Sequence, residues 1–446
     1  MKNFLTKIKI AFKTLTQRLV ITLELYSENG LANHSAAGAY GFLLSVAPML
    51  LLIAFFILTA FKSVPEAVAT LFSNIPFLNY IIDEQWLTGN FLAVTKLGIS
   101  GIISVICILW AGRILALSMQ RGLKIIFKGT KKRNFFKDTL ITLALEIAVL
   151  IFVFMLIFGS QPALFFYRTF DFIPKLSNIF FPIFNIVSPI YPIFILWLIS
   201  FFAYLFTPVN SPNKLAALQG ALFCAISYGV TSLLLDVIIN RANYNLLYGT
   251  LGNVIIMLVN VYFFFIFFFA GAQFAFVVDT FDILLFTKLR QSRIKATEYS
   301  LKKNLFSRFD FINRLFLNPE GKLKKYMQTF KPGEKIFSQG DSGNDIYYLL
   351  DGEVEVILYS TNDGNNTGKT LSVYKPGIFF GEMGYLLSEK RSATTIAKTS
   401  VCAIVLPPSI FEKILMYDTN LDRALIENIT RRLKNTNDKL SGGVKS

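Results

Sequence analysis

The sequence predicts a polytopic α-helical membrane domain of six transmembrane helices, followed by a small C-terminal β-barrel or jelly roll with flanking helices. Of the 446 residues, 54% are apolar and only 16% are charged, whereas a soluble domain averages about 25% charged residues. The deficit is uneven, because residues 1–300 hold only 12 of the 28 Asp and Glu. Near residue 330 the pattern changes from long apolar runs to short alternating segments. At least two modules are therefore expected.

The first 34 residues predict an amphipathic helix that lies on the cytoplasmic face of the membrane. Apolar residues recur there at helical spacing, with basic residues between them. The segment lacks a compact apolar core followed by small cleavage residues, which argues against a signal peptide. The apolar positions are Phe4, Leu5, Ile8, Phe12, Leu15 and Leu19, and the basic ones are Lys2, Lys7, Lys9, Lys13 and Arg18.

Between residues 35 and 280, six segments are apolar enough to cross a bilayer core of about 30 Å, which takes about 20 helical residues. The fourth is interrupted by prolines, which spans tolerate where neighbouring helices satisfy the freed carbonyls. Small residues such as Gly220-Ala221 and Gly271-Ala272 predict close contact between helices. The six segments are 36–61, 91–112, 138–160, 183–206, 215–239 and 251–279.

The loops that join these segments alternate in charge. The first 35 residues hold five Lys and Arg, and residues 113–137 hold eight. The segment after the sixth span opens with four more, whereas 62–90, 161–182 and 240–250 hold one, two and one. Basic loops face the cytoplasm, so both termini are expected there, in a multi-pass protein of the cell inner (plasma) membrane.

Few polar side chains lie within the predicted spans. A charge in hydrocarbon costs at least about 2.5–3.5 kcal/mol, so it usually faces a partner or a water-filled path. Glu146 lies deepest and is the best pathway candidate, with a structural hydrogen bond as the equally open alternative. Asp236 is expected to pair with Arg241. The uncharged polar residues are Gln219, Gln273, Asn253 and Asn260.

After the spans, residues 281–304 predict a charged helical connector and residues 305–440 a folded domain. The run 346–357 alternates like a strand. Helical spacing returns from Pro408. Several short strands at this spacing indicate a small β-barrel or jelly roll. The glycines expected to mark the turns are Gly340, Gly343, Gly352, Gly364, Gly368 and Gly377.

Within this domain, Gly381-Glu382 is followed nine residues later by Arg391. A carboxylate can accept a hydrogen bond from a sugar hydroxyl, and a guanidinium can bind a phosphate. Free N–H groups of the intervening short helix would lie beside that phosphate. The glycine would let the backbone approach such a ligand closely.

The C-terminal domain resembles the cyclic nucleotide-binding domain family in several motifs. They are Phe330-Lys331-Pro332-Gly333-Glu334, Gly340-Asp341, Gly352-Glu353-Val354, Phe380-Gly381-Glu382 and Arg391-Ser392-Ala393-Thr394.

The resemblance implies that Glu382 binds the ribose 2′-hydroxyl and Arg391 the cyclic phosphate. Ser392 and the N–H of Ala393 would complete the phosphate contacts, and Gly381 and Met383 complete the binding set. Cyclic AMP is favoured over cyclic GMP by family frequency. Tyr385 departs from the family pattern, which has an aliphatic residue there. Purine contacts are expected from the closing helix at 409–439, with Thr430, Arg431 and Thr436 as candidates.

The membrane region resembles the YihY/BrkB family of inner-membrane proteins, a family that has carried the label ribonuclease BN. The motifs are Ala36-Ala37-Gly38-Ala39-Tyr40-Gly41-Phe42-Leu43-Leu44-Ser45-Val46-Ala47-Pro48, Thr207-Pro208-Val209-Asn210, Gln219-Gly220-Ala221, Tyr248-Gly249-Thr250-Leu251-Gly252-Asn253 and Ala270-Gly271-Ala272-Gln273.

A single histidine and three separated cysteines give no metal site, so zinc chemistry is excluded and no catalytic constellation is recognised. A net charge of +16 is concentrated in loops rather than in a groove, which disfavours nucleic acid. An ion channel is disfavoured by the lack of an Arg-repeat span and of a TVGYG-like filter.

The sequence thus predicts a membrane transporter or lipid-handling protein, not an enzyme, that is regulated by a cyclic nucleotide. The alternative is a non-transporting scaffold whose C-terminal domain binds proteins or has lost its ligand. The expected partners are the lipid bilayer, the nucleotide and, in a homo-oligomer, further copies of the chain.

Overall fold

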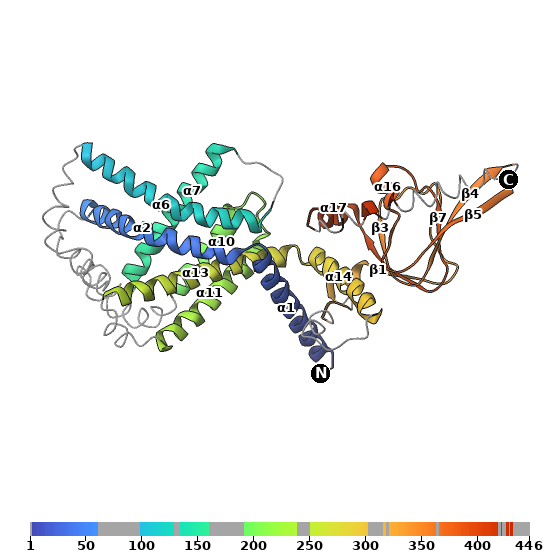
Figure 1. Ribbon diagram of the computed structural model, residues 1–446, viewed down its shortest axis with the longest axis horizontal. Helices are drawn as coiled ribbons and strands as arrows, with labels where there is room; N and C mark the ends of the chain where they lie inside the picture. The colour runs from blue at the N-terminus through green and yellow to red at the C-terminus, as the bar shows by residue number, and fades with distance from the viewer. Residues whose placement is uncertain are drawn as a thin grey trace, which may run out of the picture. The chain divides into compact units, whose positions relative to one another are not determined.

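In the computed structural model, the described part of the chain forms two compact units, a helical one and a β-rich one. The helical unit is Ile21–Asp279, and the β-rich unit joins Met1–Val20 to Thr280–Ser446. Figure 1 follows the chain from blue to red. The described residues are 2–60, 99–128, 134–159, 191–238, 250–301, 315–317, 321–362, 365–417, 421, 425–427 and 429–430.

Each of the six predicted spans overlaps a helix in the described residues, although the fourth overlaps only the 16-residue helix α10 and residues 91–98 of the second are not described. α11 and α13 pack side by side, and α2 lies against both α6 and α13. Two stretches, Lys214–Leu235 and Leu258–Asp279, are long and apolar enough to cross a membrane, and Pro192–Phe206 is a shorter apolar helix. The helices are α2 (Leu31–Ala60), α6 (Ile99–Ile126), α7 (Phe135–Gly159), α10 (Tyr191–Phe206), α11 (Lys214–Ile238) and α13 (Thr250–Asp279).

Glycines bring α11 and α13 into backbone contact. A Cβ atom at Gly220 would lie 2.5 Å from the carbonyl oxygen of Gly271, and one at Gly271 would lie 2.7 Å from that of Gly220. Beside this contact, the hydroxyl of Tyr204 donates a 2.6 Å hydrogen bond to the carbonyl of Phe268. The close helix contact predicted from these small residues is confirmed.

Two helix ends differ from the pattern read in the sequence. The basic segment 113–137 was predicted to be a loop. Its first part is helical, because α6 continues to Ile126. The first helix, α1 (Lys2–Glu28), ends before Asn29, and α2 already starts at Leu31. On α1, the apolar side chains of Ile8, Phe12 and Leu15 are exposed.

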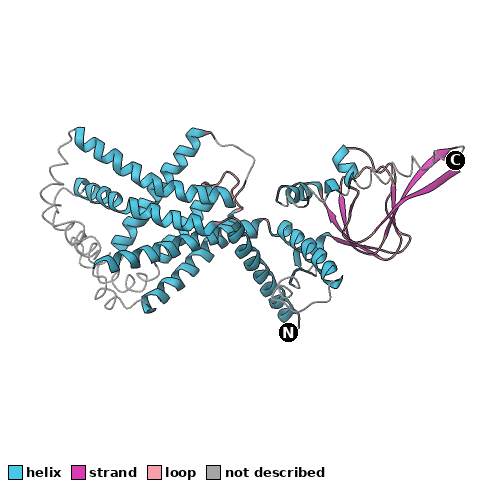
Figure 2. Cartoon of the chain, in the orientation of Figure 1, coloured by secondary structure: helices cyan, strands magenta, loops and turns pink. Residues whose placement is uncertain are grey.

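The β-rich unit contains two four-stranded antiparallel sheets, in the orders β1-β8-β3-β6 and β2-β7-β4-β5 (Figure 2). This is the sandwiched arrangement of a jelly roll, as predicted. Its elements are η3 (Gly321–Tyr326), β1 (Met327–Phe330), β2 (Lys335–Phe337), β3 (Ile346–Asp351), β4 (Val354–Asn362), β5 (Asn365–Tyr374), β6 (Phe379–Phe380), α16 (Glu382–Leu387), β7 (Thr394–Ala397), β8 (Val401–Leu406) and α17 (Pro408–Tyr417).

The strand-like run 346–357 is divided at Gly352, which adopts φ +92°. A Cβ atom there would lie 2.3 Å from the carbonyl oxygen of Ser400, so both the backbone and the space require glycine. Gly368 lies inside β5, so the prediction that it marks a turn is wrong. Gly364 lies outside the described residues. The core between the sheets is formed by Leu349, Val354, Phe380, Ala397, Val401 and Ala403.

The predicted connector is the helix α14 (Phe281–Leu301), and it packs against the strands of its own unit. The ring of Phe286 meets that of Tyr348 edge-on at 5.3 Å between centroids. The Arg293 guanidinium donates a 2.8 Å hydrogen bond to the carbonyl of Leu350 and lies 3.5 Å from the carboxylate of Asp351. The connector is therefore docked on β3.

Candidate functional site

The site begins where β6 ends and the short helix α16 starts. Pairing of Tyr347 with Phe380 and of Tyr348 with Phe379 fixes β6 against β3. Gly381 then turns the chain with φ +76°, in the left-handed region that glycine adopts at little cost. This turn places Glu382 in the first turn of α16 with only 1% of its surface exposed.

Arg391 lies at the other end of this segment, three residues before β7, and only 5% of its surface is exposed. Its guanidinium donates one hydrogen bond to the carbonyl of Gly381 and another, 2.8 Å long, to the carbonyl of Asp345. The structure therefore brings Gly381, Glu382 and Arg391 together, as the sequence predicted. Within the described part of the chain, no carboxylate is recorded in an ion pair with this guanidinium.

Aromatic rings cover the guanidinium. Its central carbon lies 4.4 Å from the ring centroid of Phe337 and 5.8 Å from that of Tyr347. Burial lowers the pKa of Arg391, against the opposing charges of Tyr347, Asp345, Asp341 and Glu382. An arginine side chain nevertheless stays protonated in proteins. The site thus holds a desolvated cation whose hydrogen-bond acceptors are neutral carbonyls, and an anion in reach would bind favourably.

The other predicted ligand residues lie at the edge of this cluster. Ser392 is exposed, and Ala393 is buried. The Met383 side chain is 39% exposed on α16 and is not part of the buried cluster. Thr430 is helical, whereas Arg431 and Thr436 lie outside the described residues.

The sequence did not identify Asp345, Phe337 or Tyr347 as neighbours of the arginine. These residues come from the β2–β3 region, and the hydrogen bond from Arg391 to Asp345 spans 46 positions in the chain. The sequence contained one weak signal for these contacts, because the aromatic residues Phe337 and Tyr347 lie in strand-like segments close to a predicted turn. It does not specify which face of which sheet they would occupy.

Gly381 is expected to be intolerant of any side chain. A Cβ atom there would lie 2.9 Å from an Nη of Arg391 and 3.2 Å from the ring of Tyr347, at a φ that side chains disfavour. We predict that Gly381→Ala weakens nucleotide binding about tenfold, because the guanidinium must move. Calorimetric titration of the full-length variant checks this, and unchanged affinity would contradict it. Gly333→Ala is a control, since it carries the same positive-φ strain with no atom within 4 Å.

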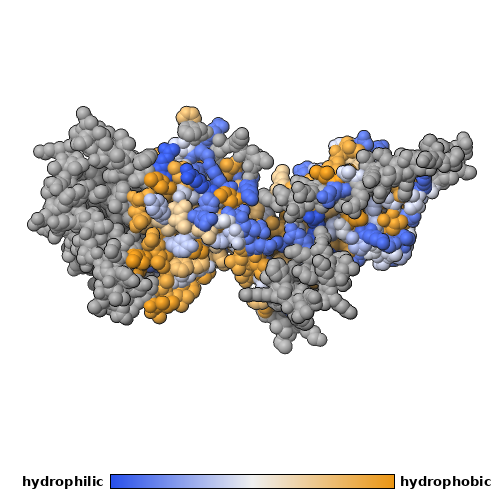
Figure 3. Space-filling view, viewed as in Figure 1, coloured by the Kyte–Doolittle hydropathy of each residue, from blue (hydrophilic) through white to orange (hydrophobic). Residues whose placement is uncertain are grey.

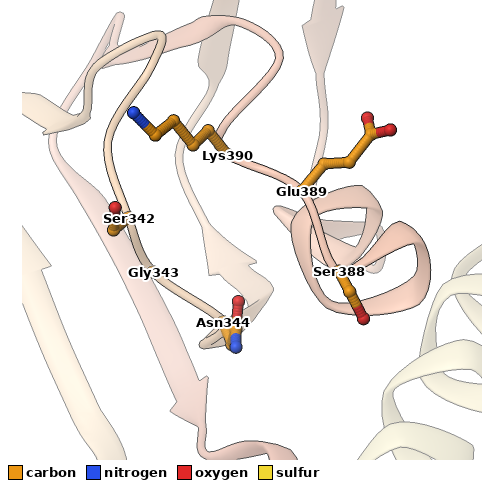
Figure 4. Close-up of a pocket in the computed structure, with 6 residues that line it drawn as sticks. All are labelled: Ser342, Gly343, Asn344, Ser388, Glu389 and Lys390. Atoms are coloured by element: carbon orange, nitrogen blue, oxygen red, sulfur yellow. The ribbon is translucent and has the colours of Figure 1, made fainter.

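A pocket of about 380 Å³ lies beside the cluster and is lined by two loops (Figure 4). One loop precedes β3 and the other follows α16, and all the lining residues are polar or glycine. Glu382 and Arg391 are not among its lining residues, although Arg391 directly follows Lys390, which is one of them. A Cβ atom at Gly343 in its lining would lie 3.4 Å from an Nη of Arg391, so the pocket adjoins the guanidinium. Its lining residues are Ser342, Gly343, Asn344, Ser388, Glu389 and Lys390.

The segment Gly381 to Arg391 is called the cassette below. Tyr385, which departs from the family pattern, joins its helix α16 to α17, the helix that follows the last strand. Its hydroxyl donates a 2.9 Å hydrogen bond to the carboxylate of Glu412 on α17, and its ring meets Phe411 edge-on. We predict that Tyr385→Phe raises nucleotide affinity up to about threefold, because α17 is then freer to rearrange around a ligand. Titration of the variant beside Tyr359→Phe tests this, and a lower affinity would contradict it.

The polar residues predicted within spans have different environments. Glu146 is buried, and Gln273 is buried and accepts a 3.1 Å hydrogen bond from Asn29. The Asn260 amide donates to the carbonyl of Ile256 in its own helix. Gln219 is exposed. The Asp236 and Asn253 side chains and Arg241 lie outside the described part, so the predicted Asp236–Arg241 pair is untested.

Two family models match the chain. One, described as Virulence factor BrkB, matches residues 22–284, and the other, described as Cyclic nucleotide-binding domain, matches residues 327–418. Among the described residues, no group of three or more His, Cys, Asp or Glu could hold a metal ion.

The curated relatives are similar over short stretches. A cGMP-dependent protein kinase of Plasmodium berghei is 41% identical over 105 residues, which cover 23% of this chain and 11% of the kinase. A cAMP-dependent protein kinase regulatory subunit of Pyricularia oryzae is 33% identical over 88 residues, 20% of this chain and 21% of that protein. The chain thus spans roughly a tenth to a fifth of these relatives. The catabolite activator protein structure of Thermus thermophilus is 26% identical, covers 26% of this chain and 55% of its own, and has a TM-score of 0.24.

Proposed function

The chain belongs to the BrkB family over residues 22–284 and carries a cyclic nucleotide-binding domain over residues 327–418, and we propose that the second domain regulates the first. In this proposal the chain is a multi-pass inner-membrane protein with six spans that transports a solute or handles lipid. Its regulatory ligand is a cyclic nucleotide, with cyclic AMP favoured over cyclic GMP. We propose no enzymatic step for it.

The observation that carries the proposal is the burial of Glu382 and Arg391 together at the start of α16. Burying a charge is costly unless it is paired. A cyclic phosphodiester has one negative charge, which one guanidinium and oriented N–H groups can match. The adjacent carboxylate suits a ribose hydroxyl.

The exposed face of α11 supports a lipid environment for the helical unit. Leu222, Ile226 and Leu233 are exposed at helical spacing, and further large apolar side chains continue the same helix on both sides. Figure 3 shows apolar surface over the helical unit. A soluble monomer rarely exposes so continuous an apolar surface, whereas lipid satisfies it. The further exposed residues are Leu215, Leu218, Val230, Leu234, Val237 and Ile238.

Phe379 supports coupling between the two domains. It lies in β6, two residues before Gly381. The centroid of its ring lies 6.1 Å from that of Phe286 on α14, 4.8 Å from that of Tyr348 on β3 and 5.9 Å from that of Phe411 on α17. α14 follows α13 in the chain after Thr280. A ligand that shifts α16 would thus bear on the helix that leads back to the last span. Coupling of this kind is typically about 1–3 kcal/mol.

Hydrogen–deuterium exchange of the full-length protein in nanodiscs tests the regulatory claim. With saturating cyclic AMP, we expect slower exchange at 381–393 and a change in α14. Cyclic GMP should give the same pattern at higher concentration. Protection confined to the cassette would support binding without regulation. No change anywhere would contradict the proposal and favour the scaffold alternative.

A further inference from the structure

A row of polar side chains runs along the contact between α6 and α7. On α7, Asp138, Thr142 and Glu146 are spaced four residues apart, so they lie on one face of the helix. α6 and α7 pack against each other. The rest of α7 beyond this row is apolar from Ile147 to Gly159. The polar residues in this part of α7 therefore lie together on one face of the helix.

Partners on α6 meet this row in antiparallel order. The amino group of Lys124 lies 2.8 Å from the carboxylate of Asp138. One turn further along α7, the Thr142 hydroxyl lies 3.1 Å from the amide oxygen of Gln120. One more turn along lies Glu146, and the positive charge that acts on its carboxylate is that of Arg113. This row of polar side chains between α6 and α7 is called the seam below. It leads from the exposed Lys124–Asp138 pair to the buried carboxylate of Glu146, which lies about 12 Å further along α7 at 1.5 Å per helical residue.

One buried donor in this seam has no hydrogen-bond partner, and a buried carboxylate lies one turn beyond Thr142. Gln120 is 3% exposed, and its amide nitrogen is buried with no hydrogen-bond partner. Glu146 is 7% exposed, and within the described residues no hydrogen bond or ion pair is recorded for its carboxylate. A seam that only held two helices together would be more stable with apolar groups in these places. A buried amide donor and a buried carboxylate in one seam indicate that something polar enters it.

We propose that this seam is a proton-binding site reached from the cytoplasmic end of α6 and α7, with Glu146 as the group that gains and loses the proton. A hydronium ion gives its proton to a carboxylate oxygen, leaving a neutral carboxyl group and a water molecule, and the reverse step releases it. The Gln120 amide provides a donor for the entering water. The inference rests on the proposed membrane location of the helical unit and extends it to a proton-linked process.

The surrounding charges favour a proton over a metal ion. A metal ion needs several oxygen ligands, whereas in the described residues of α6 and α7 the carboxylates are only Asp138, paired with Lys124, and Glu146. Arg113 would also repel a divalent cation. The other helices packed on α7 contribute little charge. α10 carries no Asp, Glu, Lys, Arg or His, and its titratable groups are Tyr191 and Tyr204. α2 carries His34 and Tyr40, and the His34 ring lies against Phe269 of α13.

Labelling with dicyclohexylcarbodiimide, which enters membranes and reacts with protonated carboxyl groups, tests the proposal. The full-length protein in liposomes is treated between pH 5.5 and 8.5 without nucleotide, and the modified peptides are quantified by mass spectrometry. We expect labelling at Glu146 that falls at least fivefold as the pH rises. Asp138, ion-paired with Lys124, is the internal control and should stay unmodified. Absent labelling at Glu146, or labelling that does not depend on pH, would overturn the proposal.

Two variants sharpen the result. Glu146→Gln should remove the label, and Gln120→Leu, which keeps the size but removes the amide, should shift the pH midpoint at Glu146. An unshifted midpoint in a variant that remains monodisperse would overturn the role given to Gln120. The labelling is independent of nucleotide binding. A chain that labels but binds no cyclic nucleotide would refute the regulatory proposal while supporting the proton site, and the opposite result would do the reverse.

Discussion

Arg391→Ala is expected to weaken cyclic nucleotide binding at least about 100-fold. The substitution removes the buried guanidinium next to Gly381 and Asp345 and with it the charge that would match a phosphate. A hydrogen bond to a charged group contributes about 1.5–3 kcal/mol. Two such bonds from the guanidinium to the ligand phosphate would amount to a factor of about 100 or more in affinity. Calorimetric titration of full-length protein in detergent measures the loss.

The matched control for this variant is Lys398→Ala. It removes one positive charge from the same domain, at an exposed residue that pairs with Glu353. Exposed pairs of this kind contribute little, so its affinity should stay within twofold of the unmodified protein. Equal affinities for Arg391→Ala and Lys398→Ala would show that the buried arginine does not hold the ligand.

Gly220→Ala is expected to destabilise the helical unit, although alanine is the better helix former. The new methyl group would lie 2.5 Å from the carbonyl oxygen of Gly271 and 2.6 Å from the Cβ of Ala275. Since the first of these atoms is backbone, α11 and α13 must separate. Overpacking typically costs about 1–3 kcal/mol. For a unit of this size, the melting temperature should fall by roughly 3–10 °C.

Gly229→Ala is the control on the same helix. Its Cβ would meet the end of the Ile193 side chain at 3.1 Å, which can rotate away. Gly-to-Ala in a helix otherwise stabilises by about 1 kcal/mol, so this variant should melt at or slightly above the unmodified protein. Thermal unfolding of purified full-length proteins in detergent compares the two. A Gly220→Ala protein as stable as Gly229→Ala would contradict the close helix contact.

The sequence could predict the cassette because its signals are local. A glycine in a turn, a carboxylate one position later and an arginine nine positions after that lie within one short segment, Gly381 to Arg391. The helix contact at Gly220 and Gly271 was readable for a similar reason, since small residues in apolar runs have few other uses. The long apolar runs likewise predicted where α2, α7 and α13 lie.

The remaining features depend on contacts between distant segments. Nothing near Arg391 in the chain indicates that Phe337 would stack on it or that Asp345 would accept its hydrogen bond. The connector was predicted as a charged helix, but its docking depends on Phe286 meeting Tyr348. The Glu146 seam shows the same limit. The sequence could identify the buried carboxylate, whereas the pairing of Thr142 with Gln120 required two helices to be placed together.

Equilibrium binding of labelled cyclic AMP to the unmodified full-length protein tests the central claim most directly. The buried Glu382 and Arg391 predict saturable binding of one nucleotide per chain, displaced by an unlabelled cyclic nucleotide and by neither 5′-AMP nor inorganic phosphate at equal concentration. Absence of saturable binding up to millimolar nucleotide, in a protein shown to be folded, would contradict the account.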